Sequence, residues 1–486
     1  MTIPFNQIPI DLRVPGTYIE FDNSRAVRGK LSVPGRILAI GQKLAAGTAA
    51  ANTPVRVDTA ALAVELFGRG SMLALMAAAI KAANRDTELW ALPLADNGGG
   101  TAAAGTITVT GPATAAGTLN LYVGGKRVQV AVASGDTANT IAAAINAAIN
   151  ADLDLPVTST VLAAEVTVTA RHKGVAAGKV DLRHSYYQGE KLPAGVTLAI
   201  VQLTGGAGNP DLATALAALG DAWHNTWVMP YTDATSLSAV ETDLANRWGP
   251  TKMIESHAFS AEVGTVGDLT TLGNSRNSPH LTIMDAGGSP TAPFIWAAVV
   301  AAVDAAETDP ARPRQTLPLP GLLAAPEGAR RTLEERNTLL YDGISTHAVD
   351  ALGGVRIERL ITTYQVNAQS LDDPSYLDVT TLRTLSHLRY SARARLATKY
   401  GRHKLANDGT RFAPGQAVVT PNVIRAEIIA LFREWEIEGL VENFDQFRDD
   451  LVVQRNAEDP NRLDVLIPPD LINQLRVIAA QIQFRV

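Results

Sequence analysis

Residues 332–367 read TLEERNTLLYDGISTHAVDALGGVRIERLITTYQVN, and this block carries the clearest structural signals in the chain. Thr332 and Glu335 have the spacing of a capping box, and Gly343 stands where a helix commonly ends. A glycine pair then leads into a β-rich run at 355–361. We therefore predict a helix, a turn and one strong strand. The block contains no nucleophile beside a base, no metal-ligand spacing and no phosphate loop.

The composition indicates several domains with ordinary cores. The chain has 486 residues, of which 46% are hydrophobic and 19% charged. A net charge of -6 argues against general binding to nucleic acid or to anionic membranes. The absence of cysteine excludes disulfides, thiolate metal sites and a cysteine nucleophile. Residues 293–304, PFIWAAVVAAVD, are too few to span a membrane and predict a buried helix, so we expect no membrane insertion.

Residues 1–29 predict an extended arm. Pro4 and Pro9 interrupt any helix and also argue against a secretory signal. The strand-like piece consists of Tyr18, Ile19, Glu20 and Phe21, followed by turn residues. Such an arm has few apolar residues to bury. It could pack on its own chain, stay mobile or pair with another molecule.

Strands alternate with helices in residues 30–96 and again in 190–326, which favours an α/β domain with a doubly wound parallel sheet. We expect 196–203, VTLAIVQL, to resume this sheet. The proline-rich passage 309–326 predicts a joint between domains.

Residues 97–189 are poor in charge and rich in Ala, Gly, Thr and Val. Several runs alternate with period two, and Gly124 and Gly125 stand between two of them as in a hairpin. An alanine-rich helix is predicted at 137–150. We interpret the segment as a small α+β insertion that protrudes from the surface of the split α/β domain.

The loop 205–210, GGAGNP, follows a strand and precedes a helix, as phosphate-binding loops do. It matches neither GxGxxG nor GxxxxGKS/T, and Pro210 lacks the amide that a phosphate would use. A plain turn is the favoured interpretation, and no cofactor is predicted.

Hydrolase residues were sought because a doubly wound sheet can carry them. The nucleophile, base and acid candidates are Asp221 with His224, His257 beside Ser256, and His280 beside Ser278 and Asp285. None lies in a GxSxG elbow, and the histidines form no HxxH or HxxxH pair for a metal. We predict that the protein is not an enzyme, with no catalytic or metal residues.

A helix is predicted at 380–400, with an apolar stripe and a basic remainder that includes Arg389, Arg393 and Lys399. The basic face could be solvated or could meet an acidic protein partner, whereas nucleic-acid binding is disfavoured because few aromatic side chains flank it. The last residues, 473–486, predict a strand that pairs either within its own domain or with another molecule.

The chain resembles the tail sheath proteins of Mu-like contractile-tailed phages, a family related to the sheaths of tailocins and contractile injection systems. The matching stretches are 8–24 (IPIDLRVPGTYIEFDNS), 205–212 (GGAGNPDL), 334–340 (EERNTLL), 356–365 (RIERLITTYQ), 372–400 (DDPSYLDVTTLRTLSHLRYSARARLATKY), 413–421 (APGQAVVTP) and 454–471 (QRNAEDPNRLDVLIPPDL). They occur in order over nearly the whole chain.

The resemblance implies a fold: a core domain of subtilisin-like topology, an outward-facing insertion, an α+β C-terminal assembly domain at 327–472 and a terminal arm at 473–486. It also implies intersubunit strand exchange by Tyr18, Ile19, Glu20, Phe21, Val355, Ile357, Ile482, Gln483, Phe484, Arg485 and Val486. A contact with the tail tube is expected from Arg389, Arg393 and Lys399.

The implied function is that of a structural subunit. It would polymerise with itself as a sixfold helix around the tube protein, bind baseplate and tail terminator proteins, and contract to drive the tube through a host envelope. It would reside in the virion after assembly in the bacterial cytoplasm, without direct contact to nucleic acid. The alternatives are a hydrolase on a subtilisin-like scaffold and an adhesin that displays residues 97–189.

Overall fold

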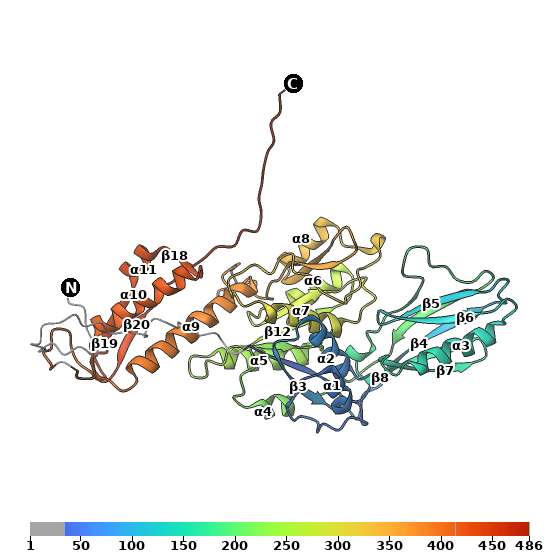
Figure 1. The fold of residues 1–486 in the computed structure, drawn as a ribbon, viewed down its shortest axis with the longest axis horizontal. Helices are drawn as coiled ribbons and strands as arrows, with labels where there is room; N and C mark the ends of the chain where they lie inside the picture. The colour runs from blue at the N-terminus through green and yellow to red at the C-terminus, as the bar shows by residue number, and fades with distance from the viewer. Residues whose placement is uncertain (1–34, 414, 486) are drawn as a thin grey trace, which may run out of the picture.

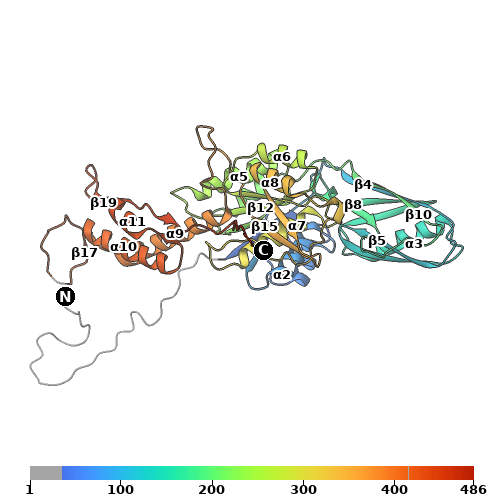
Figure 2. The same ribbon diagram turned by 90° about the horizontal axis from the view of Figure 1, so that it is seen from above.

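The computed structural model describes residues 35–413 and 415–485. The expected arm strand at 18–21 and the terminal Val486 therefore lie outside the described residues. Three bodies follow one another along the long axis: a β-rich insert at one end, a sheet domain in the middle and a mainly helical domain at the other end (Figures 1 and 2).

The middle body is built on an eight-stranded sheet. Its order is β15 (Val355–Arg359), β14 (Ile344–Val349), β13 (Leu281–Asp285), β12 (His257–Glu262), β11 (Thr226–Val228), β1 (Arg36–Gln42), β3 (Glu88–Leu94) and β2 (Val55–Arg56). The strands from β14 to β3 run parallel, and β15 and β2 pair antiparallel at the two edges.

The strand order reverses between β1 and β11. The chain moves from β1 outward to β3 through α1 (Ala60–Phe67) and α2 (Met72–Ala83). It moves in the opposite direction from β11 to β12 through α5 (Ala234–Trp248), and from β12 to β13 through α6 (Val266–Asn274). Because crossovers between parallel strands are right-handed, opposite directions place these two sets of helices on opposite faces of the sheet.

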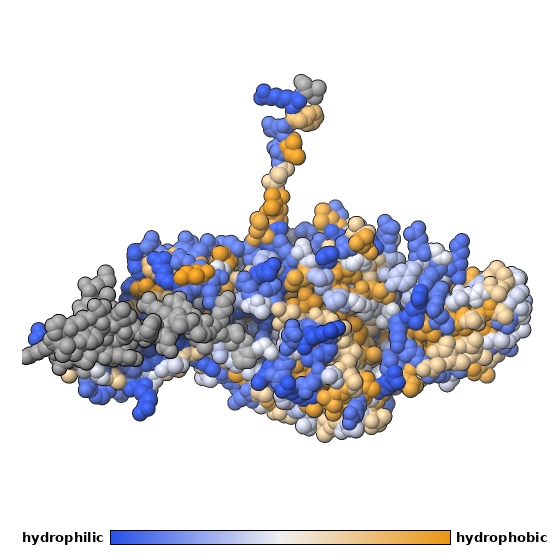
Figure 3. All heavy atoms as spheres, viewed as in Figure 1, coloured by the Kyte–Doolittle hydropathy of each residue, from blue (hydrophilic) through white to orange (hydrophobic). Residues whose placement is uncertain are grey.

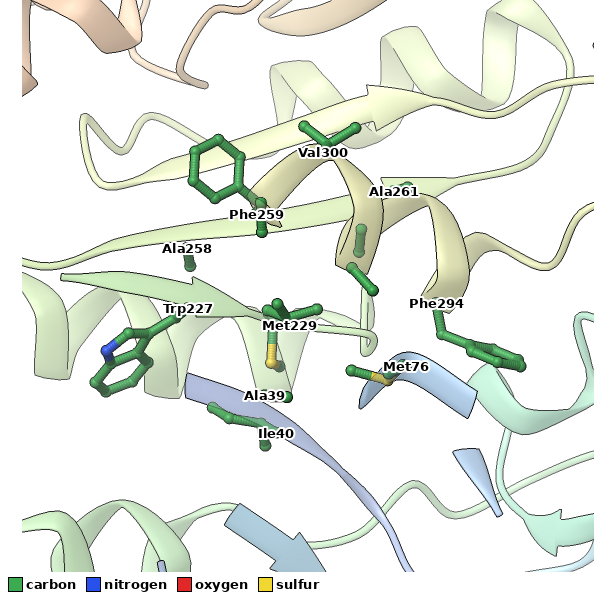
Figure 4. Close-up of a cluster of buried hydrophobic side chains, with 14 of the residues drawn as sticks. Ala39, Ile40, Met76, Trp227, Met229, Ala258, Phe259, Ala261, Phe294 and Val300 are labelled. Carbon is green, nitrogen blue, oxygen red and sulfur yellow. The ribbon is translucent and has the colours of Figure 1, made fainter. Parts of the chain in front are cut away.

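The central core lies between the sheet and two helices. The helix α7 (Pro293–Ala306) packs on α2 and across β1, β11 and β12. It is apolar nearly all round, as expected for a buried helix. Met76 of α2, Phe294 of α7 and Met229 after β11 lie in this core (Figure 4). Burial of each such side chain stabilises the fold by about 1.5–3 kcal/mol.

The insert has its own hydrophobic core, separate from that of the middle body. It contains a four-stranded sheet, β10 (Thr197–Thr204), β4 (Ala102–Thr110), β8 (Glu165–Lys173) and β7 (Val157–Leu162), a three-stranded sheet, β6 (Lys126–Val132), β5 (Gly117–Val123) and β9 (Leu182–His184), and the helix α3 (Ala138–Ala151). Gly124 and Gly125, both with positive φ, form the expected hairpin turn. The insert projects from one end of the molecule (Figure 1).

One expectation about the central sheet is wrong. Residues 196–203 do not resume the parallel sheet, because β10 pairs antiparallel with β4 in the insert. Leu198 and Ile200 pack against the insert core, whereas Thr197 and Thr204 are exposed. A parallel core strand is buried on both faces, so these polar positions suit a sheet that is buried on only one face.

Residues 332–367 belong to the middle body. We had placed them in the C-terminal domain. Thr332 and Glu335 form the expected capping box at α8 (Leu333–Tyr341), and Gly343 follows that helix with φ +74°. A second strand, β14, was not predicted. Its sequence ISTHAV looks polar, yet the Ser345 and Thr346 hydroxyl groups are hydrogen-bonded within the fold and the strand is largely buried.

A single long helix connects the middle body to the C-terminal domain. The helix α9 (Val379–Tyr400) begins with Val379 in the central core and continues to Leu388 in a third apolar cluster. The rest of that domain comprises α10 (Pro421–Ile437), α11 (Phe444–Asp450), β16 (Lys404–Leu405), β17 (Val418–Val419), β18 (Val441–Glu442), β19 (Val452–Arg455), β20 (Leu463–Leu466) and β21 (Asp470–Leu471).

The predicted terminal strand does not form within this chain. Residues 473–485 are assigned neither helix nor strand, and those after Arg476 run away from the body (Figure 1). Ile482 and Phe484 are 90% and 82% exposed, and the projecting segment carries apolar residues along its length (Figure 3). Within the described residues, the alternative of pairing inside its own domain is therefore wrong.

A close helix contact gives a test of this packing. A Cβ at Gly273 of α6 would overlap the backbone oxygen of Asp342 at the end of α8. We expect Gly273→Ala to lower the free energy of unfolding by at least about 2 kcal/mol, because the two backbones must separate. Gly267→Ala in the same helix, where the nearest atom is 3.8 Å away, should be neutral or slightly stabilising. Urea unfolding measures both, and equal effects would contradict the contact.

Candidate functional site

The hydrolase candidates do not assemble into a triad. Asp221 is exposed and pairs with Lys252, whereas His224 is buried against the Trp90 ring. The Ser256 hydroxyl group donates to the carbonyl oxygen of Ile254 and not to a histidine.

The other two sets are equally dispersed. The His257 Nε2 atom lies 2.8 Å from the Thr282 hydroxyl oxygen, and Asp285 pairs with Arg331. Ser278 accepts a hydrogen bond from the backbone amide of His280, not from its ring. Burial lowers the pKa of His224 and of His280 to about 4, so both rings are neutral near pH 7. Among the described residues, no serine, histidine and carboxylate form a hydrogen-bonded chain.

The glycine-rich loop 205–210 is a seam between the insert and the middle body. A Cβ at Gly206 would lie 2.5 Å from the carbonyl oxygen of Gly174. Asn209 donates from Nδ2 to Asp233, and its Oδ1 accepts from the amide of Ala176. These contacts give the glycines a packing role, in agreement with a plain turn.

Metal and membrane sites were also sought in the described part of the chain. No group of three or more His, Cys, Asp or Glu residues there could hold a metal ion. No helix there is long and apolar enough to cross a membrane.

The basic residues of α9 contact partners within the chain. Arg389 lies 2.5 Å from Glu255, donates to the carbonyl oxygen of Trp248, and stacks over the Trp248 ring at 4.3 Å. Arg393 is exposed and reaches only the carbonyl oxygen of Met253. The structure thus brings Arg389 and Arg393 together against the middle body, and places Lys399 elsewhere.

Lys399 belongs to a cluster around Glu427 of α10. This carboxylate also accepts hydrogen bonds from Arg395 and Tyr400. Burial alone would raise the pKa of Glu427, but the hydrogen bonds from Lys399, Arg395 and Tyr400 outweigh that effect and lower the pKa to about 2. The cluster joins α9 to α10.

A fully buried ionic contact lies where α9 leaves the middle body for the C-terminal domain. Asp304 at the end of α7 is fully buried and accepts from Arg314 at 2.8 Å and from Arg383 of α9 at 2.6 Å. Burial would raise the pKa of Asp304, yet the attraction of both guanidinium groups lowers it to about 2. Sequence reasoning missed this cluster, because the only signals were an aspartate inside an apolar helix, an arginine ten residues later and another arginine 79 residues away.

Val355 and Ile357 do not offer an open edge for an exchanged strand. Both side chains are buried in the central core. One edge of β15 pairs with β14, and residues 316–319 cover the other, with Thr316 and Leu319 donating to the carbonyl oxygens of Ile357 and Val355. In the isolated chain, β15 therefore has no free edge that could receive a strand.

The exposed apolar surface lies elsewhere. The two-stranded hairpin of β19 and β20 pairs with no other strand among the described residues, and Leu466 is 60% exposed. Ile482 and Phe484 project on the terminal segment, and Gln483 and Arg485 alternate with them. An unpaired hairpin and an unpaired amphipathic segment are the parts needed for strand addition between molecules.

The ionic junction yields a stability prediction. Asp304→Asn should lower the free energy of unfolding by about 3–5 kcal/mol at pH 7, because two buried guanidinium groups lose their counter-ion. Asp309→Asn is the matched control, since Asp309 is exposed and accepts only a backbone hydrogen bond. Urea unfolding of the unassembled chain measures both, and a small loss in Asp304→Asn would contradict the assignment.

The same junction predicts acid sensitivity. The folded pKa of Asp304, about 2, lies below the unfolded value of about 3.9. Its contribution is therefore complete above about pH 4 and is lost as the pH falls towards 2. Asp304→Asn should flatten the decline of stability over this interval, and an unchanged slope would count against the role of the carboxylate.

Comparison with known proteins follows the same division of the chain. Residues 98–197 match the model described as phage tail sheath protein beta-sandwich domain, residues 205–363 the phage tail sheath protein central domain, and residues 372–485 the phage tail sheath C-terminal domain. The chain is 46% identical over 486 residues to the Mu-like prophage FluMu tail sheath protein of Haemophilus influenzae, with full coverage of both.

A solved sheath protein has a similar fold. A sheath tail protein from Listeria innocua aligns with a TM-score of 0.50 at 12% identity, covering 92% of this chain and 94% of that one. The sheath complex of an extracellular contractile injection system in its contracted state aligns with a TM-score of 0.46 at 12% identity, covering 97% and 98%. On the strength of the matching domains and of the full-length relative, this chain belongs to the phage tail sheath family and is a tail sheath protein of a contractile tail.

Proposed function

We propose that the chain polymerises with itself as a sixfold helix around a tail tube and contracts to drive that tube through a host envelope. Its other partners are the tube protein and the baseplate and tail terminator proteins. The polymer assembles in the bacterial cytoplasm and resides in the virion. The observation that carries the proposal is the segment 477–485, which pairs with no strand of this chain and leaves its apolar side chains exposed.

An exposed amphipathic segment favours an occupant from another molecule. Ile482 and Phe484 lie on one side of an extended chain, and burying each would contribute about 1.5–3 kcal/mol. The hairpin of β19 and β20 is the receiving surface that we favour, in place of β15. Residues 18–21 are proposed as a second donated strand.

The polymer supplies the work without a nucleotide. Identical subunits that slide and rotate can bury more surface in the contracted packing, while exchanged strands keep them connected. In the glycine-rich loop, Gly206 and Gly208 pack against the backbone of neighbouring segments.

The three bodies have distinct proposed roles. The core domain is assigned a subtilisin-like topology, which its reversal of strand order between β1 and β11 supports. The insert faces away from the tube, since it forms a separate body at the end opposite the C-terminal domain (Figure 1). Display of the insert as an adhesin would be an additional role and is not favoured over the sheath.

Removing the terminal residues tests strand exchange. Deletion of 482–486 should leave a folded chain that no longer forms long polymers, because the donated strand loses its apolar anchors. Gln483→Ser, on the polar side of the segment, is the control. Electron microscopy measures polymer length and circular dichroism measures folding. Polymers of normal length after the deletion would contradict the exchange.

Charge reversal tests the expected contact of Arg389, Arg393 and Lys399 with the tube. Arg393→Glu is the cleanest variant, because Arg389 and Lys399 carry ion pairs that hold the fold together. We expect Arg393→Glu to weaken co-assembly with purified tube by about tenfold at low salt, and the loss should shrink as salt screens the charges. Lys191→Glu, an equal charge change in the insert, should have no effect. Unchanged co-assembly of Arg393→Glu would remove this face from the tube contact.

A further inference from the structure

Residues 472–476 pass from contacts with the C-terminal domain to contacts with the middle body. The amide of Ile472 donates to the carbonyl oxygen of Leu440 at 3.1 Å, and Asn473 donates to Glu442 at 2.9 Å, so both belong to the C-terminal domain. The next residues reach the joint between the C-terminal domain and the middle body. Gln474 donates to the carbonyl oxygen of Ala311 at 3.0 Å, in the joint that follows α7.

Arg476 completes this crossing. Its Nη2 atom lies 2.9 Å from Asp378, and its Nη1 atom lies 3.3 Å from Gln315. Gln315 in turn donates to the carbonyl oxygen of Leu475 at 3.2 Å. The Arg476 side chain is only 18% exposed, whereas every described residue after it is exposed. Arg476 is therefore the last fixed point before the free segment.

Asp378 is well placed to hold an arginine under load. It occupies the N-cap position of α9, but its side chain makes no capping hydrogen bond. Its carboxylate instead lies 3.1 Å from Arg359 of β15 and 2.9 Å from Arg476. A negative charge at a helix N-terminus is favourable, and hydrogen bonds between charged groups are about twice as strong as neutral ones. The contact reaches the edge of the eight-stranded sheet through Arg359.

We propose that Arg476 anchors the root of the C-terminal arm, residues 477–485, to the central sheet domain through Asp378 and Gln315. Tension on the arm then passes to the sheet domain and to the start of α9, rather than through the small C-terminal domain that precedes the arm in sequence. The anchor also fixes the direction in which the arm leaves the body. Nine extended residues reach about 30 Å, which is far enough to meet another subunit.

This role rests on the proposed strand exchange, with Arg476 as a positioning residue rather than a part of the exchanged strand. From Gln481 onward, the free segment alternates Ile482 and Phe484 with polar residues. Its apolar side must face the receiving sheet, and a twist at the root would turn that side away. A fixed root therefore presents one side of the arm consistently to its partner.

The first test uses the unassembled chain. Arg476→Met removes the guanidinium group and keeps an apolar stem, and Arg485→Met on the free segment is the control. A chymotrypsin-type protease should cut native protein after Phe484, and Arg476→Met should be cut after Leu475 at least about tenfold faster than native protein, because the root opens. Urea unfolding should be unchanged. Equal cleavage after Leu475 in native protein and Arg476→Met would overturn the anchor.

The second test uses assembled sheaths and separates this inference from the proposed function. Sheaths of Arg476→Met should break into shorter pieces on contraction, whereas native and Arg485→Met sheaths stay whole under electron microscopy. Contracted Arg476→Met sheaths of native length would overturn the load-bearing role. If native protein formed no polymer at all, the proposed function would fail, and the protease test would still decide whether Arg476 holds the root.

Discussion

The arrangement of the middle body and the C-terminal domain depends on the carboxylate of Asp304. It is fully buried, and it holds Arg314 of the joint and Arg383 of α9 against the end of α7. A buried ion pair is weak evidence for stability, since desolvation offsets the attraction. This ion pair instead specifies an arrangement. The two cations can be buried only where this carboxylate lies, so the joint and α9 take one position relative to the sheet.

That single position makes α9 a stiff connection. Val379 packs in the central core and Leu388 in the C-terminal cluster, so one uninterrupted helix belongs to both bodies. Arg389 with Glu255 fixes the middle of the helix to the sheet domain, and Glu427 fixes its end to α10. A sheath that transmits force needs subunits that move as units, and a helix held along its whole length resists bending at the joint.

Local signals in the sequence predicted local structure well. The capping box of Thr332 and Glu335, the hairpin at Gly124 and the buried helix predicted at 293–304 are confirmed, because each depends on neighbouring residues. β10 was misassigned and β14 missed, since pairing partners and buried hydroxyl groups depend on distant segments. The basic side of α9 likewise gave no hint that Arg389 reaches a carboxylate 134 residues away.

The exposed arm sets the balance between the free chain and the polymer. Ile482 and Phe484 are more than four-fifths exposed, a state that water disfavours for large apolar side chains. These side chains can be buried only by contact with another surface. The anchored root directs the arm away from the β19 and β20 hairpin of its own chain. The free energy of burying Ile482 and Phe484 therefore does not stabilise the isolated chain. It becomes available only when the folded chain associates with another.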